Sequence, residues 1–133
     1  MTAMVEGQVR MSFITMTAAL PCVESERLRG LATTGEKRGG ALPNLPTIAE
    51  SGFPGFEASA WYGLLVPAGT SNAIISRLYE QTVRALNAPE VKNRLEAAGF
   101  NIVGSSPAAF GAYMKAEIKK WAPVIESSGV KPE

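Results

Sequence analysis

Residues 70–99 read TSNAIISRLYEQTVRALNAPEVKNRLEAAG and contain the clearest secondary-structure signal in the chain. Thr70 or Ser71 is suited to cap a helix, and the apolar residues that follow recur along one helical face. These apolar residues are Ile75, Leu78, Tyr79, Val83 and Leu86. A proline then begins a second helix, which Gly99 is placed to end. The pattern therefore predicts helices over 71–87 and 89–98.

A third helix is predicted over 107–126, because Ser106 and Pro107 form a typical helix start. Its apolar stripe is more typical of a face that packs in a core than of a ligand-binding surface. The stripe consists of Phe110, Tyr113, Met114, Ile118, Trp121 and Ile125.

Three further stretches are rich in residues that favour strands, and we predict strands near 9–14, 28–33 and 57–66. Between the last two, Thr47 and Glu50 have the spacing of a capping box, which predicts a single helical turn. Strands that alternate with helices make the predicted fold class α/β.

Composition excludes several classes of function. The 13 basic and 12 acidic residues give a net charge of +1 and are scattered, so we expect no nucleic-acid partner. The chain has no histidine and one cysteine, Cys22. Without histidine, Cys22 has no activating base, and neither a catalytic triad nor an ordinary zinc site can form. We therefore expect no enzyme activity, no catalytic residue, no metal and no cofactor.

Several short motifs, weak singly, occur together in one order over most of the chain. The most extensive are LPNLPTIAESG at 42–52 and WYGLLVPAGT at 61–70, preceded by LRGLATT at 28–34. From about Gly7 onward the chain resembles the substrate-binding proteins of tripartite tricarboxylate transporters. These are the Bug or TctC-like extracytoplasmic solute receptors.

The resemblance implies part of a two-lobed, type II-like periplasmic binding protein fold, because members of the family are about twice as long. On this reading, residues 1–55 belong to the second lobe and 56–67 form the strand that crosses between lobes. Residues 68–133 supply C-terminal helices that return to the first lobe. The N-terminal lobe would be largely missing.

The resemblance also implies a ligand site at the loop after the first strand, with Phe13, Ile14, Thr15 and Thr17 as candidates. Relatives often have Phe-Asp-Asn at this loop and an aspartate where Arg10 stands, so the polar groups differ here. Helix capping is an equally good interpretation of the two threonines.

Three more residues are candidate ligand contacts. Thr33 and Thr34 follow the second strand, where a turn role is the alternative. Trp61 lies near the crossover, and core packing is its alternative.

Two functions remain open at this point. The first is a solute-binding component, or a fragment of one, for a small carboxylate (a dicarboxylate, tricarboxylate or amino acid) that works with membrane transporter subunits. The alternative is a truncated receptor without a leader that acts as a self-associating or protein-interaction domain, and we expect a homo-oligomer. The resemblance implies a periplasmic location. The N-terminus lacks the pattern of a signal peptide, which favours the cytoplasm if the start is genuine.

Overall fold

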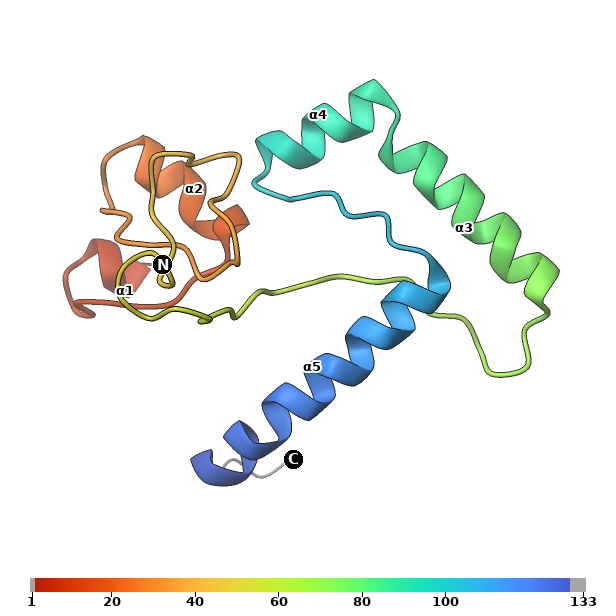
Figure 1. The fold of residues 1–133 in the computed structure, drawn as a ribbon. Coiled ribbons are helices and arrows are strands. Elements are labelled where there is room, and N and C mark those ends of the chain that lie inside the picture. The colour runs from red at the N-terminus through yellow and green to blue at the C-terminus, as the bar shows by residue number, and fades with distance from the viewer. Residues whose placement is uncertain (1, 130–133) are drawn as a thin grey trace. The chain divides into compact units, whose positions relative to one another are not determined.

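The computed structural model describes residues 2–129 of the chain, and helices are its main regular elements (Figure 1). In chain order they are α1 (Thr2–Val5), α2 (Met16–Glu24), α3 (Asn72–Leu86), α4 (Pro89–Ala97) and α5 (Pro107–Ser128). The chain divides into unit 1, Met1–Tyr62 with Ala85–Ile102, and unit 2, Gly63–Arg84 with Val103–Glu133. Residue 1, at the start of the predicted second-lobe segment 1–55, lies outside the described residues. So do residues 130–133, at the end of the predicted segment 68–133.

The three long helices predicted from the sequence are confirmed as α3, α4 and α5. Ser106 caps α5 as predicted, because its hydroxyl accepts a hydrogen bond from the Ala109 amide at 3.3 Å. Pro107 follows at the first helical position, where the missing N–H has no cost. Local sequence chemistry thus determines where this helix begins.

Helix α4 ends in the way the sequence predicts. Gly99 has a φ of +83°, and its amide donates to the carbonyl of Glu96 at 3.0 Å. The Phe100 amide donates to the carbonyl of Leu95, also at 3.0 Å. These two bonds form a Schellman motif, which satisfies carbonyls that the helix leaves free.

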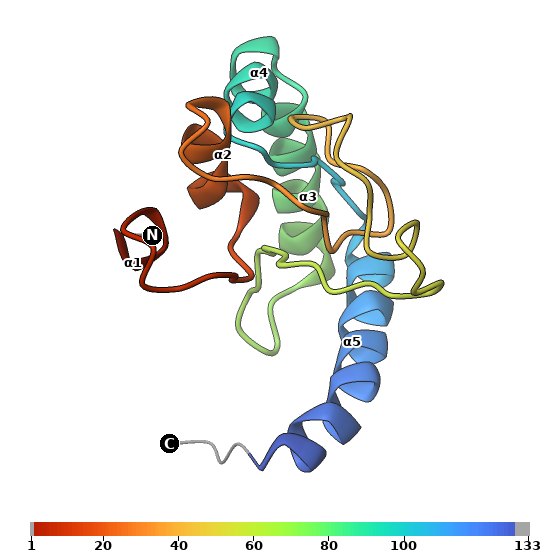
Figure 2. The ribbon, with the colours of Figure 1, turned by 90° about the vertical axis from the view of Figure 1, so that its left-hand side faces the viewer.

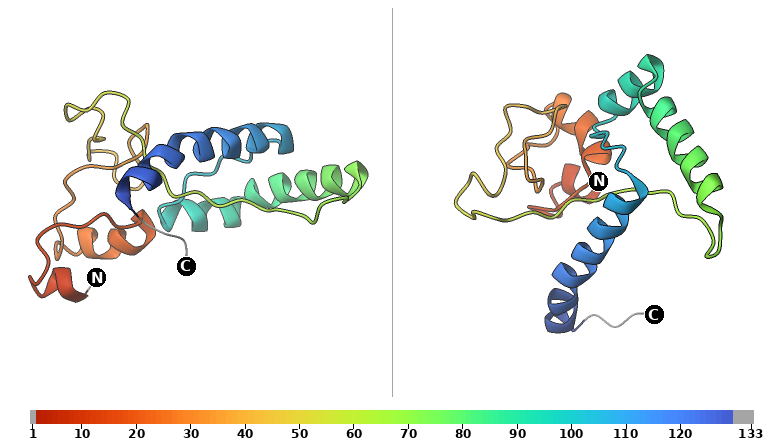
Figure 3. Two further views of the ribbon diagram at one scale, coloured as in Figure 1. Left: turned by 90° about the horizontal axis from the view of Figure 1, so that it is seen from below. Right: turned by 45° about the vertical axis from the view of Figure 1, so that its right-hand side comes forward.

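The predicted strands at 9–14, 28–33 and 57–66 are wrong for the part of the chain that the structure describes. These segments are coil in the ribbon views of Figure 2 and Figure 3, apart from one isolated parallel bridge between Thr33 and Thr47. A strand is stable only when neighbouring strands pair with its N–H and C=O groups. The α part of the α/β prediction is therefore confirmed, and the β part is not.

The core is small. Among residues 2–129, Leu20 on α2 is the one apolar side chain that is fully buried, at 6% exposure. Helix α5 buries the stripe predicted to be core only in part, because Phe110, Met114 and Trp121 are half-buried, whereas Ile118 is 70% exposed and Ile125 is 53% exposed. An amphipathic helix needs an opposing apolar surface to cover such a face. The described residues supply that surface for only part of the stripe.

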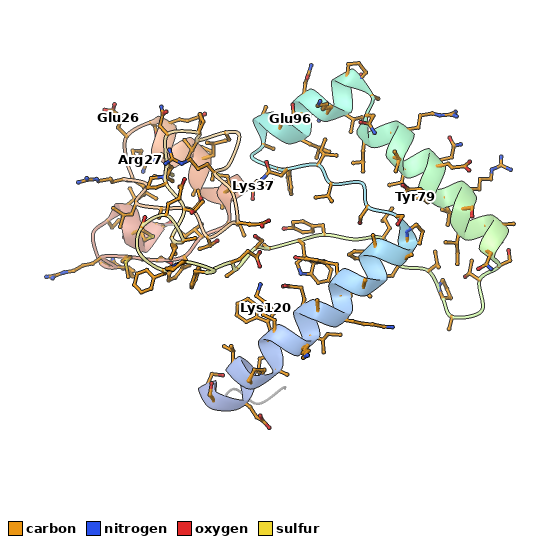
Figure 4. All side chains as sticks on the ribbon, in the orientation of Figure 1. Glu26, Arg27, Lys37, Tyr79, Glu96 and Lys120 are labelled. Carbon is orange, nitrogen blue, oxygen red and sulfur yellow. The ribbon has the colours of Figure 1, made fainter. Side chains whose placement is uncertain are left out.

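Unit 2 contains a polar cluster along α5, marked in Figure 4 by Lys120. The buried Glu117 carboxylate accepts hydrogen bonds from Trp121 Nε1 at 2.9 Å and from Lys120 Nζ at 3.1 Å. The Lys120 ammonium also lies 5.3 Å from the centre of the Trp121 ring. Residues three and four apart meet on one helical face, so the helix alone brings this triad together.

Candidate functional site

The first group of predicted site residues lies at the start of α2. Thr15 is the N-cap residue, and its carbonyl accepts from the amides of Ala18 and Ala19, both at 3.0 Å. Its hydroxyl makes no capping bond and instead lies 3.3 Å from the hydroxyl of Thr17. The capping interpretation is therefore correct for the backbone of Thr15 and wrong for its side chain. Two neighbouring hydroxyls at a helix N-terminus suit an anionic ligand.

The other two residues of this group differ in exposure. Phe13 is 73% exposed, and Ile14 is half-buried. A single exposed ring is common on protein surfaces and does not by itself indicate a partner. Phe13 is thus free to contact a ligand or another surface, whereas Ile14 belongs to the packing of unit 1.

Met16 fixes the position of the α2 N-terminus within unit 1. A Cβ placed on Gly99 would lie 2.7 Å from Met16 Cγ, and one on Gly39 would lie 3.3 Å from Met16 Cε. The side chain of Met16 therefore packs directly against the end of α4 and against the 35–46 loop. Local sequence patterns do not reveal this role of Met16, because these contacts join segments that are distant along the chain.

The second predicted group, Thr33 and Thr34, lies on a short extended segment. The Thr33 amide donates to the Pro46 carbonyl at 2.8 Å, and the Thr33 carbonyl accepts from the Ile48 amide at 2.9 Å. The Thr34 carbonyl accepts from the Ala58 amide at 2.8 Å. The backbone is thereby held on both sides, so the simple turn interpretation is wrong for these two residues.

The hydroxyl of Thr33 is buried and has no hydrogen-bond partner among residues 2–129. Buried hydroxyl groups are nearly always hydrogen-bonded, because an unpaired one loses its bonds to water without replacement. Thr33 therefore has an unused capacity to bind a polar group. The two threonine groups share no hydrogen bond in the described chain, and the structure does not join them into one pocket.

Trp61, the last predicted site residue, is 43% exposed, so it is not a core residue of this structure. Its neighbour Tyr62 packs edge-on against Phe100, with ring centroids 5.7 Å apart. This contact anchors the backbone next to Trp61 within unit 1. The exposed part of the indole is compatible with the predicted wall of a binding site.

The guanidinium of Arg38 is a second feature that local sequence patterns do not reveal. Its Nε donates to both carboxylate oxygens of Glu50, at 2.9 and 3.1 Å. Glu50 completes the predicted capping box, since its carboxylate accepts from the Thr47 amide at 2.7 Å and its amide donates to the Thr47 hydroxyl at 3.1 Å. The capping box is confirmed, although it closes a hydrogen-bonded turn and not a helical turn. Arg38 lies 12 residues before Glu50 in the sequence, and patterns of neighbouring residues do not extend that far.

The pKa of Glu50 lies below its ordinary value of 4.5, first because its carboxylate accepts from the Thr47 amide and then because of Arg38. A group whose pKa is lowered in the folded state stabilises that state above its unfolded pKa. The stabilisation is lost as the pH falls through the folded pKa.

We therefore predict that acidification below about pH 4.5 releases the turn at Thr47. In an NMR titration, the Thr47 amide shift should move as its acceptor is protonated. The variant Glu50→Gln should show no such step, because its side chain does not titrate. An unchanged Thr47 titration in that variant would assign the step to another carboxyl group.

The part of the chain that the structure describes has few other features that could bind a ligand. Helix α4 carries an open hollow of about 300 Å³ lined by Val91, Arg94 and Leu95, none of them a predicted site residue. Between residues 2 and 129, no three acidic, cysteine or histidine side chains are grouped to hold a metal ion. No described helix has both the length and the apolar character needed to span a membrane.

Comparisons with known proteins give a consistent result. The family model described as the tripartite tricarboxylate transporter family receptor matches residues 1–130. Protein BugT of Bordetella pertussis is 34% identical over 125 residues, which cover 94% of this chain and 38% of BugT. A UPF0065 protein from the tcbD-tcbE intergenic region of Pseudomonas sp. strain P51 is 33% identical over 92% of this chain and 37% of its own length. The chain thus spans less than two fifths of these two relatives.

Solved structures agree with this assignment. The structure described as R. palustris Rpa4515 with adipate has a TM-score of 0.82 and 32% identity, covering 99% of this chain and 44% of that one. The periplasmic binding protein BugD has a TM-score of 0.72 and 29% identity over 86% of this chain and 39% of its own. The helices and coil of this chain therefore follow the backbone of less than half of a periplasmic binding protein.

Proposed function

Because this chain belongs to the tripartite tricarboxylate transporter receptor family, we propose that it supplies one side of a binding cleft for a small dicarboxylate. The family consists of extracytoplasmic solute receptors rather than enzymes. One observation carries the choice of ligand. A relative that matches nearly the whole chain, with a TM-score of 0.82, is described with adipate.

The chemistry of the threonine groups supports this proposal. Hydroxyls, backbone amides and helix N-termini can bind a carboxylate without a formal cation. Thr15 and Thr17 present paired hydroxyls at the N-terminus of α2, and Thr33 has a buried hydroxyl with unused capacity. In this proposal, Phe13 and Trp61 supply apolar contacts to the methylene chain of the ligand, and Ile14 and Thr34 complete the wall.

For the chain as a whole, we propose that residues 1–55 belong to the second lobe, that 56–67 cross between lobes and that 68–133 return to the first lobe. The longer receptor would act in the periplasm with membrane transporter subunits. Receptors of this kind gain affinity when two lobes close around the ligand and exclude water. This chain alone should therefore bind a dicarboxylate only weakly.

Adipate titration of the labelled 133-residue chain, followed by NMR, tests the proposal. We expect a Kd on the order of 1 mM, with shifts centred on Thr15, Thr17, Thr33 and Thr34. Hexane-1,6-diamine is the matched control, because it has the same chain length and the opposite charge. Equal responses to both compounds, or adipate shifts confined to other residues, would overturn the proposed site.

A second candidate function, a self-associating module, is favoured by a different observation. Unit 2 exposes large apolar side chains on its extended segment and on α5, among them Leu64, Leu65 and Ile118. Surfaces of this kind usually contact another surface. Self-association does not require any ligand, so light scattering without adipate separates it from the first proposal.

A further inference from the structure

A brace of side chains closes the loop that separates Thr34 from Thr47. Arg38 Nε contacts both carboxylate oxygens of Glu50, and Arg38 Nη1 donates to the carbonyl of Pro43 at 3.4 Å. The Arg38 guanidinium therefore connects the first part of the loop to Pro43, near the end of the same loop. It also connects the loop to Glu50, in the turn that follows. We refer to the Arg38–Glu50 contact as the brace.

The brace acts directly on Thr47, which is 1% exposed. Glu50 Oε2 accepts from the Thr47 amide at 2.7 Å, so one carboxylate joins a surface arginine to a buried backbone group. Ser51 adds a bond from its hydroxyl to the Thr47 carbonyl at 2.8 Å. The amide, carbonyl and hydroxyl of Thr47 are therefore all hydrogen-bonded, which leaves this residue little freedom.

Thr47 in turn pairs with Thr33 in the isolated parallel bridge. The two residues that flank Thr47 make the actual bonds, Pro46 through its carbonyl and Ile48 through its amide. A displacement of Thr47 would therefore disturb the bonds that its two neighbours make to Thr33. Hydrogen bonds from Arg38 to Glu50 and from Glu50 to Thr47, and then the backbone on either side of Thr47, connect Arg38 to the segment that contains the proposed ligand contacts.

We infer that Arg38 and Glu50 are positioning residues, which order the Thr33–Thr34 segment through Thr47 and so determine how well it binds a carboxylate. The inference rests on the proposed function, since it assigns a role to residues around the same site. Neither residue needs to touch the ligand.

The brace need not be a strong ion pair to have this effect. Both side chains are 46% exposed, and ion pairs so accessible to water contribute little to stability by themselves. The effect comes from geometry, because the Arg38 Nε–H, shared between both carboxylate oxygens, holds the carboxylate that accepts from the buried Thr47 amide. The loop from Thr34 to Pro46 has no regular secondary structure to hold it otherwise.

Amide hydrogen exchange on the full 133-residue chain tests the ordering role. The informative amides are those of Ile48 and Ala58, which donate to the carbonyls of Thr33 and Thr34. Arg38→Met and Glu50→Gln should each accelerate this exchange about fivefold or more, because local opening becomes easier. The double variant should add little, since both changes remove one contact.

Lys37→Met is the matched control, because it removes a neighbouring positive charge (Figure 4) and leaves the brace intact. Its exchange should stay close to that of the natural chain. Unchanged exchange in α5 of every variant verifies that the helices persist. Equal acceleration by Lys37→Met, or none by Arg38→Met and Glu50→Gln, would overturn the inference.

Adipate titration of the same variants tests the link to binding. We expect the adipate affinity read at Thr33 and Thr34 to fall about threefold or more in Arg38→Met and Glu50→Gln, and to stay unchanged in Lys37→Met. Faster exchange with unchanged affinity would overturn the positioning role and leave a purely structural brace. If the natural chain gives no adipate shift at these threonines, the proposed function fails, and the exchange result alone decides whether the brace orders the segment.

Discussion

The purified chain is expected to self-associate, with an apparent mass in light scattering that rises with concentration. The reason lies in the segment that follows Tyr62 in unit 2. Leu64 is 77% exposed and Leu65 is 73% exposed, and both are in extended backbone with no strand partner among residues 2–129. Unpaired extended segments with apolar side chains readily pair with another chain.

The magnitude of this effect can be estimated from buried area. Covering about 600 Å² of apolar surface, at about 25 cal/mol per Å², would contribute roughly 15 kcal/mol. Association costs about 4–15 kcal/mol in lost translational and rotational freedom. The difference lies between zero and about 11 kcal/mol, so burial can offset the cost of association, and the mass should depend on concentration.

Paired substitutions identify the responsible segment. Replacing Leu64 and Leu65 with lysine should shift the chain towards the monomer, because burying two charges at a contact is costly. Ser76→Lys is the matched control, since it adds a lysine at an exposed polar position of α3 in the same unit. A natural chain that stays monomeric at all concentrations and binds no hydrophobic dye would contradict the expectation. So would an equal effect of Ser76→Lys.

The helices could be predicted because the signals that define them are local. Ser106 and Pro107 start α5 through contacts within one turn, and Gly99 ends α4 through bonds to the preceding turn. Such contacts depend on residues only a few positions apart, so they can be read from the sequence. The same holds for the capping box of Thr47 and Glu50.

The strands could not be predicted correctly because a strand depends on its neighbours. The segments at 9–14 and 57–66 have suitable residues, but pairing requires other strands at a fixed distance. Similar reasoning applies to the site. The resemblance to a known family made Thr15 and Thr17 candidates, whereas Arg38 and Met16 act across 12 residues or more and show no local signal.

The largest expected effect on folding comes from Gly63→Ala, because Gly63 lies against the ring of Phe110. A Cβ at Gly63 would overlap Phe110 Cζ and lie 2.6 and 2.9 Å from Cε1 and Cε2 of that ring. Side chains in real proteins do not approach so closely, so the ring or the backbone must move. Overpacking of this kind typically costs about 1–3 kcal/mol. Thermal unfolding followed by circular dichroism measures the loss.

Gly111→Ala is the matched control, because it makes the same chemical change inside α5 where a Cβ would meet nothing within 4 Å. That variant should gain about 0.5–1 kcal/mol, since alanine favours the helix over glycine. Measuring both in the Leu64→Lys/Leu65→Lys background keeps association from masking the difference. Adding Phe110→Leu should recover part of the loss in Gly63→Ala, because a smaller side chain makes room for the methyl group. If Gly63→Ala does not lower the stability of the Leu64→Lys/Leu65→Lys chain, Phe110 does not hold this segment against α5. The exposed leucines that follow Gly63 would then be free to move.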